Sequence, residues 1–173
     1  ADLTLLAAAR GPGGFTGIRL VLSALAGLAA GSGAAVAGFE YLPLLARGAA
    51  SFGPGTVLAF THARSRLAHV QAYRMGPPDA ARPLAPAQVL SYEAAAELAR
   101  TLAQSEEASA TSPLLLLGSA LRRDPDFFAA LAAETPGTVV LPPAWDHPGP
   151  DLLLAAALEA DGPLEPLYLR PSD

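Results

Sequence analysis

Short apolar runs alternate with longer segments in which apolar residues recur at helical spacing. Glycine, proline or a capping side chain bounds most of these segments and marks where one element ends and the next begins. These boundaries predict strands at residues 3–9, 35–38, 56–63, 67–75, 114–117 and 138–141. They predict helices at residues 15–30, 41–50 and 91–103, from Asp124 or Asp126 to about Glu134, and from Asp151 to Glu159. The alternation of strands and helices is typical of an α/β fold.

The cluster Phe52, Gly53, Pro54 and Gly55 is the best internal boundary. It separates the remainder of a first lobe (1–52) from a second lobe (56–150), and a C-terminal helix and tail follow (151–173). Three further segments are predicted to be irregular because they are rich in proline or polar residues: 76–86, 106–113 and 142–150.

One stretch raises the question of a membrane, because residues 20–39 carry no charge. Twenty residues could span a bilayer. However, alanine and glycine dominate the stretch, and Gly31, Ser32 and Gly33 interrupt it, so its transfer energy into lipid is small. The sequence therefore predicts a soluble helix, turn and strand, and no membrane partner.

Composition excludes several classes of protein. Of the 173 residues, 51% are apolar and the mean hydropathy is +0.33, which excludes a mainly disordered chain. Sixteen acidic residues face eleven basic ones, all of them arginine, and the net charge of −5 disfavours binding to a nucleic-acid backbone by this chain alone. The sequence contains no cysteine, so disulfides and thiolate metal sites are impossible.

A glycine-rich loop between the first predicted strand and helix is the most informative segment. It consists of Gly11, Pro12, Gly13, Gly14, Phe15, Thr16, Gly17, Ile18 and Arg19. A strand that runs through such a loop into a helix can point backbone N–H groups at an anion. The loop lacks both the Walker A sequence and the spacing of a dinucleotide fingerprint. Two interpretations stay open: a turn that only starts the helix, and a possible anion-binding site.

The helix after this loop carries two apolar stripes. One holds Ile18, Val21, Leu22, Leu25 and Leu28, and the other holds the small-residue set Gly17, Leu20, Ala24, Gly27 and Gly31. One stripe suffices for a helix on a sheet, so two stripes predict burial on two sides. The second side could be covered by a partner helix or by another segment of the same protein.

No catalytic constellation emerges from the remaining polar residues. The three histidines, His62, His69 and His147, lack metal-ligand spacing, and neither Ser32 nor Ser119 lies in a Gly-x-Ser-x-Gly motif. Structural or solvent roles are the simpler expectation for them. The arginines at 64, 66, 122 and 123 are expected to be solvated, with phosphate contact as the alternative. The sequence predicts no active site that is complete within this chain, so no catalytic residue and no metal ligand is assigned.

Several segments resemble the TsaB (YeaZ) family of bacterial tRNA threonylcarbamoyladenosine biosynthesis proteins. The loop resembles that family's Gly-Pro-Gly-Ser-Phe-Thr-Gly-hydrophobic-Arg motif, and residues 165–170 resemble its C-terminal Glu-Pro-x-Tyr-Leu-Arg. Residues 37–39 resemble its next strand, and Ala63-Arg64 resembles the end of its Asp-Ala-Arg hairpin. The chain departs from the family at Gly14, where serine is usual, at His62, where aspartate is usual, and at residues 67–69.

The resemblance implies an actin/Hsp70-like (ribonuclease-H-like) pair of α/β lobes. It implies a cytoplasmic protein without chemistry of its own, although the family is sometimes labelled a glycoprotease or peptidase. Such a protein would scaffold the complex that adds threonylcarbamoyl to the tRNA adenosine beside the anticodon. Its dimerisation helix would bind the catalytic sister protein TsaD or, without it, a second copy. The ATPase TsaE completes the complex, ATP or ADP and a metal would be present only within it, and tRNA would be reached indirectly.

Two further expectations follow. The alternative function is that of an actin-like ATPase or phosphate-binding enzyme that uses the loop from Gly11 to Gly17. The TsaB family also carries a strand hairpin and a helix before the strand that corresponds to residues 3–9. By that comparison the first lobe is expected to be incomplete, with an exposed sheet edge or an edge paired with another chain.

Overall fold

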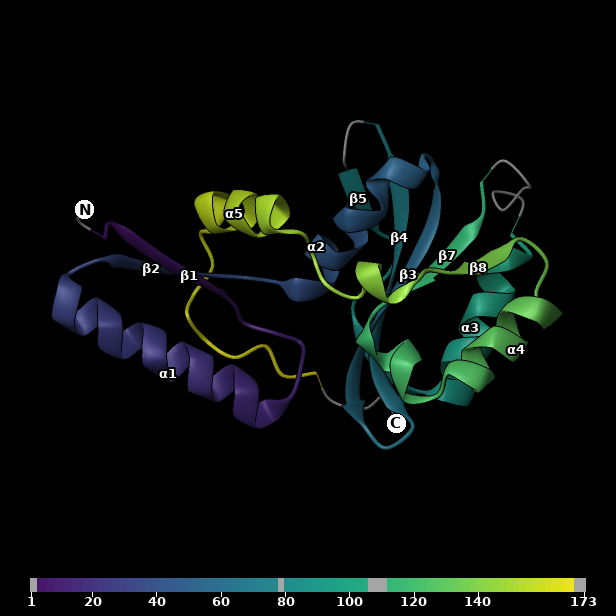
Figure 1. Cartoon of the computed structure of the whole chain (residues 1–173), viewed down its shortest axis with the longest axis horizontal. Coiled ribbons are helices and arrows are strands. Elements are labelled where there is room, and N and C mark those ends of the chain that lie inside the picture. The colour runs from purple at the N-terminus through teal and green to yellow at the C-terminus, as the bar shows by residue number, and fades with distance from the viewer. Residues whose placement is uncertain (1–2, 78–79, 106–111, 170–173) are drawn as a thin grey trace.

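The computed structural model describes residues 3–77, 80–105 and 112–169. Within them, five α-helices and eight strands form a mixed α/β fold with two sheets (Figure 1). The helices are α1 (Phe15–Ser32), α2 (Tyr41–Gly48), α3 (Tyr92–Ala103), α4 (Pro125–Glu134) and α5 (Pro150–Glu159). The strands are β1 (Leu5–Ala9), β2 (Ala35–Phe39), β3 (Gly55–Arg64), β4 (Leu67–Gly76), β5 (Ala80–Pro83), β6 (Gln88–Ser91), β7 (Leu114–Leu117) and β8 (Thr138–Val140).

The smaller sheet contains only β1 and β2, which are parallel and are joined by α1. Helices α1 and α5 lie on its opposite faces (Figure 1). Apart from an isolated bridge between Gly38 and Gly162, no other described residue extends this sheet. The expected exposed edge is therefore present. A run as uniformly apolar as residues 3–9 is typical of a strand buried on both faces. That expectation is wrong for β1, because a two-stranded sheet is too narrow to enclose it and only Ala8 is buried.

The larger sheet has the order β5-β4-β3-β7-β8, and β6 pairs with the same edge of β4 as β5 does. The predicted β3–β4 hairpin is confirmed, and the parallel strands β7 and β8 extend the sheet on the other side of β3. Alternate residues of β3 enter two cores. Leu58 and Phe60 pack with α3 and α4, whereas Val57 and Ala59 pack with α2.

Helix α2 packs on the larger sheet although it precedes the expected lobe boundary at residues 53–55. Leu42, Leu45 and Ala46 are buried against Val57 and Tyr73. A short 3-10 helix, Ala49–Phe52, follows α2 where the sequence predicts the last turn of an α-helix. The chain therefore enters the larger α/β unit at α2.

The inner row of α1 differs from the predicted stripe. Leu22 is buried, and Ile18, Leu25 and Ala29 are half-buried beside it. Val21 and Leu28 were expected on this side, but they are 45% and 57% exposed. The reason is the width of the sheet below, because two strands can cover only one row of helix positions.

Three other local expectations need correction. Residues 76–86 are not all loop, since β5 pairs with β4 and ends at Pro83, a residue that an edge strand tolerates. Strand β6 was missed because it runs directly into α3. Ser91, the first residue of the predicted helix, caps α3 by accepting from the Ala94 N–H. Helix α5 is capped by Gly149 rather than by Asp151, whereas Asp124 caps α4. Most of the polar connection predicted at 106–113 lies outside the described residues.

Helix α1 is long and apolar enough to cross a membrane, judged by length and composition alone. It has 18 residues with a mean hydropathy of 1.4, and most of them are exposed. Leucine, isoleucine, valine and phenylalanine supply most of this hydropathy, with alanine adding less, and one face of the helix packs on β1 and β2.

Candidate functional site

Backbone hydrogen bonds hold the glycine loop between three segments of the chain. The Arg10 N–H donates to the carbonyl of Phe39 at 2.9 Å, and the Leu167 N–H donates to the carbonyl of Arg10 at 2.8 Å. The Gly11 carbonyl accepts from the Tyr41 N–H at 2.9 Å. Gly11 has φ +126, and a Cβ there would lie 2.9 Å from the carbonyl oxygen of Leu167. Only glycine fits this position, both in conformation and in space.

Phe15, Arg19 and Tyr168 form a cluster at the start of α1. The guanidinium of Arg19 lies 3.9 Å from the ring centre of Phe15 and donates from Nε to the Tyr168 hydroxyl at 2.7 Å. The rings of Phe15 and Tyr168 stack with centroids 5.5 Å apart. The structure thus joins the two segments that carry the most specific resemblance, whereas Arg170 of the second segment lies outside the described residues.

The other loop residues fall into two groups. Gly11 and Pro12 are buried and Gly13 is half-buried, whereas Gly14, Thr16 and Gly17 are exposed. Gly14 precedes α1 without a side-chain cap, and no acidic residue lies in the first turn of the helix. The loop is therefore held by backbone contacts with residues 39, 41 and 167, and the exposed residues of the first turn of α1 remain accessible to solvent beside the cluster.

The small-residue set on α1 forms one exposed face of the helix. Gly17, Leu20, Ala24, Gly27 and Gly31 are all exposed, and they lie on the side opposite Leu22. Leu20 is 69% exposed. A Cβ placed on any of these three glycines would meet no atom within 4 Å. The exposed residues Val21 and Leu28 widen the face, and Arg19 is the helix's one charged residue, so this is a flat, nearly uncharged apolar surface.

His62 and His69 do not form a metal site. His69 is buried, and its Nδ1 lies 3.2 Å from the Thr61 hydroxyl. Burial, and then the charge of His62, lowers the pKa of His69. The pKa of His62 is lowered by burial and then by Arg123. The described residues contain no group of three His, Asp or Glu side chains that could hold a metal ion.

The loop that carries Trp145 is held by a polar network. Arg122 donates from Nε to Asp146 at 2.8 Å and from a terminal nitrogen to the Leu141 carbonyl at 2.7 Å. The Tyr41 hydroxyl lies 2.9 Å from His147 Nδ1. Burial, followed by the charge of Asp146, raises the pKa of Tyr41. Arg122 was expected to be solvated, but its bonds to Asp146 and to the Leu141 carbonyl commit it to the structure.

Arg66 is also committed to structure. It forms ion pairs with Glu93 at 2.5 Å and with Asp124 at 2.7 Å, which tie the β3–β4 turn to α3 and α4. Its guanidinium lies 5.5 Å from the ring centre of Tyr92. Arg66 nevertheless remains exposed, and so does Arg64 at the end of β3.

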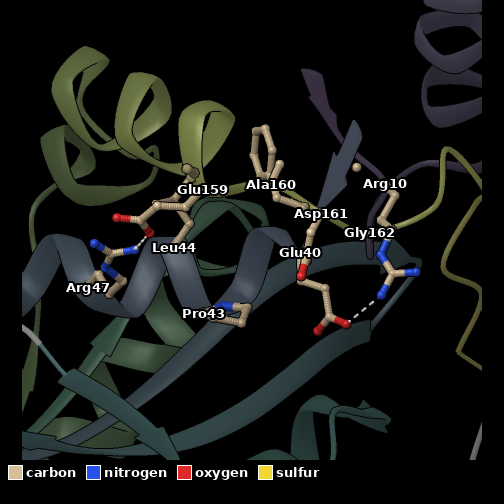
Figure 2. Close-up of a pocket in the computed structure, with 12 residues that line it drawn as sticks. Arg10, Glu40, Pro43, Leu44, Arg47, Glu159, Ala160, Asp161 and Gly162 are labelled. Carbon is tan, nitrogen blue, oxygen red and sulfur yellow. Dashed lines mark hydrogen bonds and ion pairs between the residues drawn. The ribbon is translucent and has the colours of Figure 1, made fainter. Parts of the chain in front are cut away.

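A groove of about 300 Å³ lies between α2, α5 and β2. Figure 2 shows an ion pair on each side of it: Arg10 with Glu40 at 2.9 Å, and Arg47 with Glu159 at 3.3 Å. Each arginine already faces a carboxylate, and Asp161 lines the groove as well, so the groove offers no unpaired positive charge to an anion. Gly162 lies beside it, where the chain leaves α5.

Comparison with known proteins identifies the fold. No family model matches the sequence, and no curated protein matches it. A solved structure of YeaZ from Pseudomonas aeruginosa superposes with a TM-score of 0.66 at 22% identity, over 96% of this chain and 74% of that chain. The chain has the fold of YeaZ. A second structure is that of an uncharacterized protein with similarity to peptidase YeaZ from Pseudomonas aeruginosa. It gives a TM-score of 0.64 at 22% identity, over 96% of this chain and 73% of the other.

The resemblance to the TsaB (YeaZ) family is thus confirmed at the level of the fold. The structure also shows what sequence reasoning missed, namely that Arg19, Phe15 and Tyr168 form one cluster. The only signal for it was that the two motifs with the most specific resemblance lie at opposite ends of the chain. Spacing could not pair them, because no regular periodicity connects residues 149 positions apart.

Proposed function

We propose that this chain is a non-catalytic scaffold of the TsaB type, with an actin/Hsp70-like pair of lobes. It would act in the cytoplasm in the complex that adds threonylcarbamoyl to the tRNA adenosine beside the anticodon. The observation that carries the proposal is the exposed small-residue face of α1 on a chain with the YeaZ fold. Its partners would be TsaD and TsaE, with a homodimer in their absence and tRNA reached through the complex.

The chemistry of the α1 face supports a helix as the partner. Glycine and alanine at Gly17, Ala24, Gly27 and Gly31 would allow a second helix to approach closely, and Leu20 would supply apolar area at the centre. A face of this kind without charge is costly to leave in water and is typical of an interaction surface. Association would bury it, and the role of the chain would be to position the partner rather than to react.

Substitutions on this face test the proposal. Ala24→Arg and Gly27→Arg each place a long charged side chain where the partner helix would pack, so it would be buried without a counter-charge. Both variants should abolish binding to TsaD, and also homodimer formation as measured by light scattering. Ala130→Arg is the matched control, because Ala130 is an exposed alanine of α4, far from α1 in the fold (Figure 1). Circular dichroism checks that all three variants keep their secondary structure.

Unchanged association in both α1 variants would contradict the proposed interface. A second measurement separates the scaffold from the alternative ATPase. The purified chain should hydrolyse neither ATP nor peptides above background, and its addition to TsaD, TsaE and tRNA should increase the yield of modified tRNA. Turnover by the isolated chain that disappears with Thr16→Ala or Arg19→Ala would favour a phosphate-binding enzyme that uses residues 11–17.

A further inference from the structure

A cavity of about 260 Å³ lies beneath the glycine loop, apart from the outer face of α1. Strand β1 ends at Ala9 and leads into the loop, and β7 ends at Leu117 and leads into Gly118 and Ser119. Ala9 and Ser119 both line the cavity, together with Thr61 and His62 of β3. The carboxyl ends of parallel strands from the two sheets therefore meet here. This is the place where open α/β sheets bind ligands.

The turn that follows β7 at Gly118 and Ser119 is as closely packed as the glycine loop. Gly118 has φ +121, and a Cβ there would overlap the carbonyl oxygen of Phe60. Only glycine permits β7 to turn this close to β3. The turn brings the Ser119 hydroxyl within 3.3 Å of the His62 N–H, which donates to it. The Ser119 proton is then free to point elsewhere.

Several polar groups at the cavity have no hydrogen-bond partner among the described residues. His62 Nδ1 is buried and has no hydrogen-bond partner. The hydrogen bonds of the described residues also leave the N–H groups of Gly13 and Gly14 without an acceptor. A buried polar atom without a partner, such as His62 Nδ1, requires an explanation, and a bound ion is one of them. No carboxylate is found among the described residues that line the cavity, so nothing there repels negative charge.

We propose that this cavity binds a compact oxyanion, either a phosphate group or a carboxylate, through Ser119, His62 and the backbone N–H groups of Gly13 and Gly14. The Ser119 hydroxyl and the glycine N–H groups donate to the oxygens. His62 donates from whichever ring nitrogen faces the ligand, and Arg123, close enough to act on His62, adds positive potential. Tyr41 also lines the cavity, but its hydroxyl already pairs with His147.

The test uses the full chain and inorganic phosphate, with sodium acetate as the carboxylate probe and sodium chloride at matched ionic strength. Backbone and histidine NMR signals are followed during each titration. Phosphate or acetate should shift the amide signals of Gly13 and Gly14 and the ring signals of His62 saturably, whereas chloride should not. Ser119→Ala should weaken the affinity at least tenfold. Ser65→Ala is the matched control, because Ser65 is exposed at the tip of the β3–β4 turn.

Each outcome decides the matter. A response to phosphate alone identifies a phosphate site, and a response to both probes identifies a general oxyanion site. Equal shifts with chloride, or equal affinity in the Ser119→Ala and Ser65→Ala variants, would overturn the proposal. If Ser119→Ala does not fold, the titrations of the wild-type chain test the proposal alone. Signals of Gly13, Gly14 and His62 that do not shift with phosphate or acetate would then overturn it. Ala24→Arg should keep the response, so failure here is distinguishable from failure of the α1 interface.

Discussion

Arg19 donates from Nε to the hydroxyl of Tyr168 at 2.7 Å, although the two residues lie 149 positions apart. The contact ties the first turns of α1 to the segment that follows α5. The same guanidinium packs on Phe15, so the segment is held by both a hydrogen bond and ring contacts. The start of α1 is therefore fixed by the C-terminal part of the chain and not by a capping side chain.

Two substitutions at Tyr168 separate these contributions. Tyr168→Phe removes the hydrogen bond and keeps the ring, and should cost about 0.5–1.5 kcal/mol of local stability. Tyr168→Ala removes both and should open the segment further. Hydrogen exchange of the Leu167 amide, which is bonded to the Arg10 carbonyl, reports this opening. Exchange in Tyr168→Phe as fast as in Tyr168→Ala would show that the ring contacts contribute nothing.

Glycine is required where the segment after α5 crosses β2. A Cβ on Gly38 would lie 2.5 Å from the carbonyl oxygen of Pro163, and the Gly38 N–H donates to Gly162 at 2.9 Å. Gly38→Ala should therefore lower the free energy of unfolding by about 1–3 kcal/mol. Gly27→Ala is the matched control, because a Cβ there meets nothing and alanine favours a helix by about 1 kcal/mol. Urea denaturation should show a loss for the first and none for the second.

The burial of His69 predicts a loss of stability in mild acid. Burial lowers the pKa of His69 below 6.5 in the folded chain, and the pKa of His62 shifts in the same direction. The unfolded chain then binds more protons, so stability is complete above pH 6.5 and declines as the pH falls towards the folded pKa. His69→Gln should flatten the unfolding free energy between pH 7 and 5. Thr61→Val removes the hydroxyl that contacts His69 but keeps the titrating ring, so the unfolding free energy should still depend on pH as in the wild type. A steep pH dependence that persists in His69→Gln would show that another group causes it.

Much of the fold was predictable because its elements end at strong local signals. Gly33 ends α1 in the left-handed conformation, and Ser91 and Asp124 cap α3 and α4 as their side chains predict. Strand β5 could not be found in this way, because proline disfavours strands and its pairing with β4 depends on tertiary contact. The exposure of Val21 could not be predicted either, because it depends on the small width of the β1–β2 sheet and not on the periodicity of the helix.

The candidate sites were predictable to different degrees. Small residues at helical spacing indicated the exposed face of α1 directly, since the face belongs to a single helix. The cavity beneath the loop combines three distant segments, at Gly13, His62 and Ser119, and no spacing in the sequence relates them. A surface that belongs to one helix can be found from the periodicity of its sequence. A site that the sheet topology brings together from distant segments can be found only once the fold is known.

The two sheets should differ strongly in protection from hydrogen exchange. Strands β1 and β2 form a parallel pair, most residues of β1 are only half-buried, and two strands rarely give independent stability. Strand β3 lies inside the larger sheet, and Leu58 and Phe60 are fully buried. Amides of β1 at residues 5–9 should therefore exchange through local opening, while those at residues 57–60 should exchange only on global unfolding. If a partner covers α1, adding TsaD should slow exchange in β1 and leave β3 unchanged. Equal protection of the two strands in the isolated chain would show that the small sheet is stable without any partner.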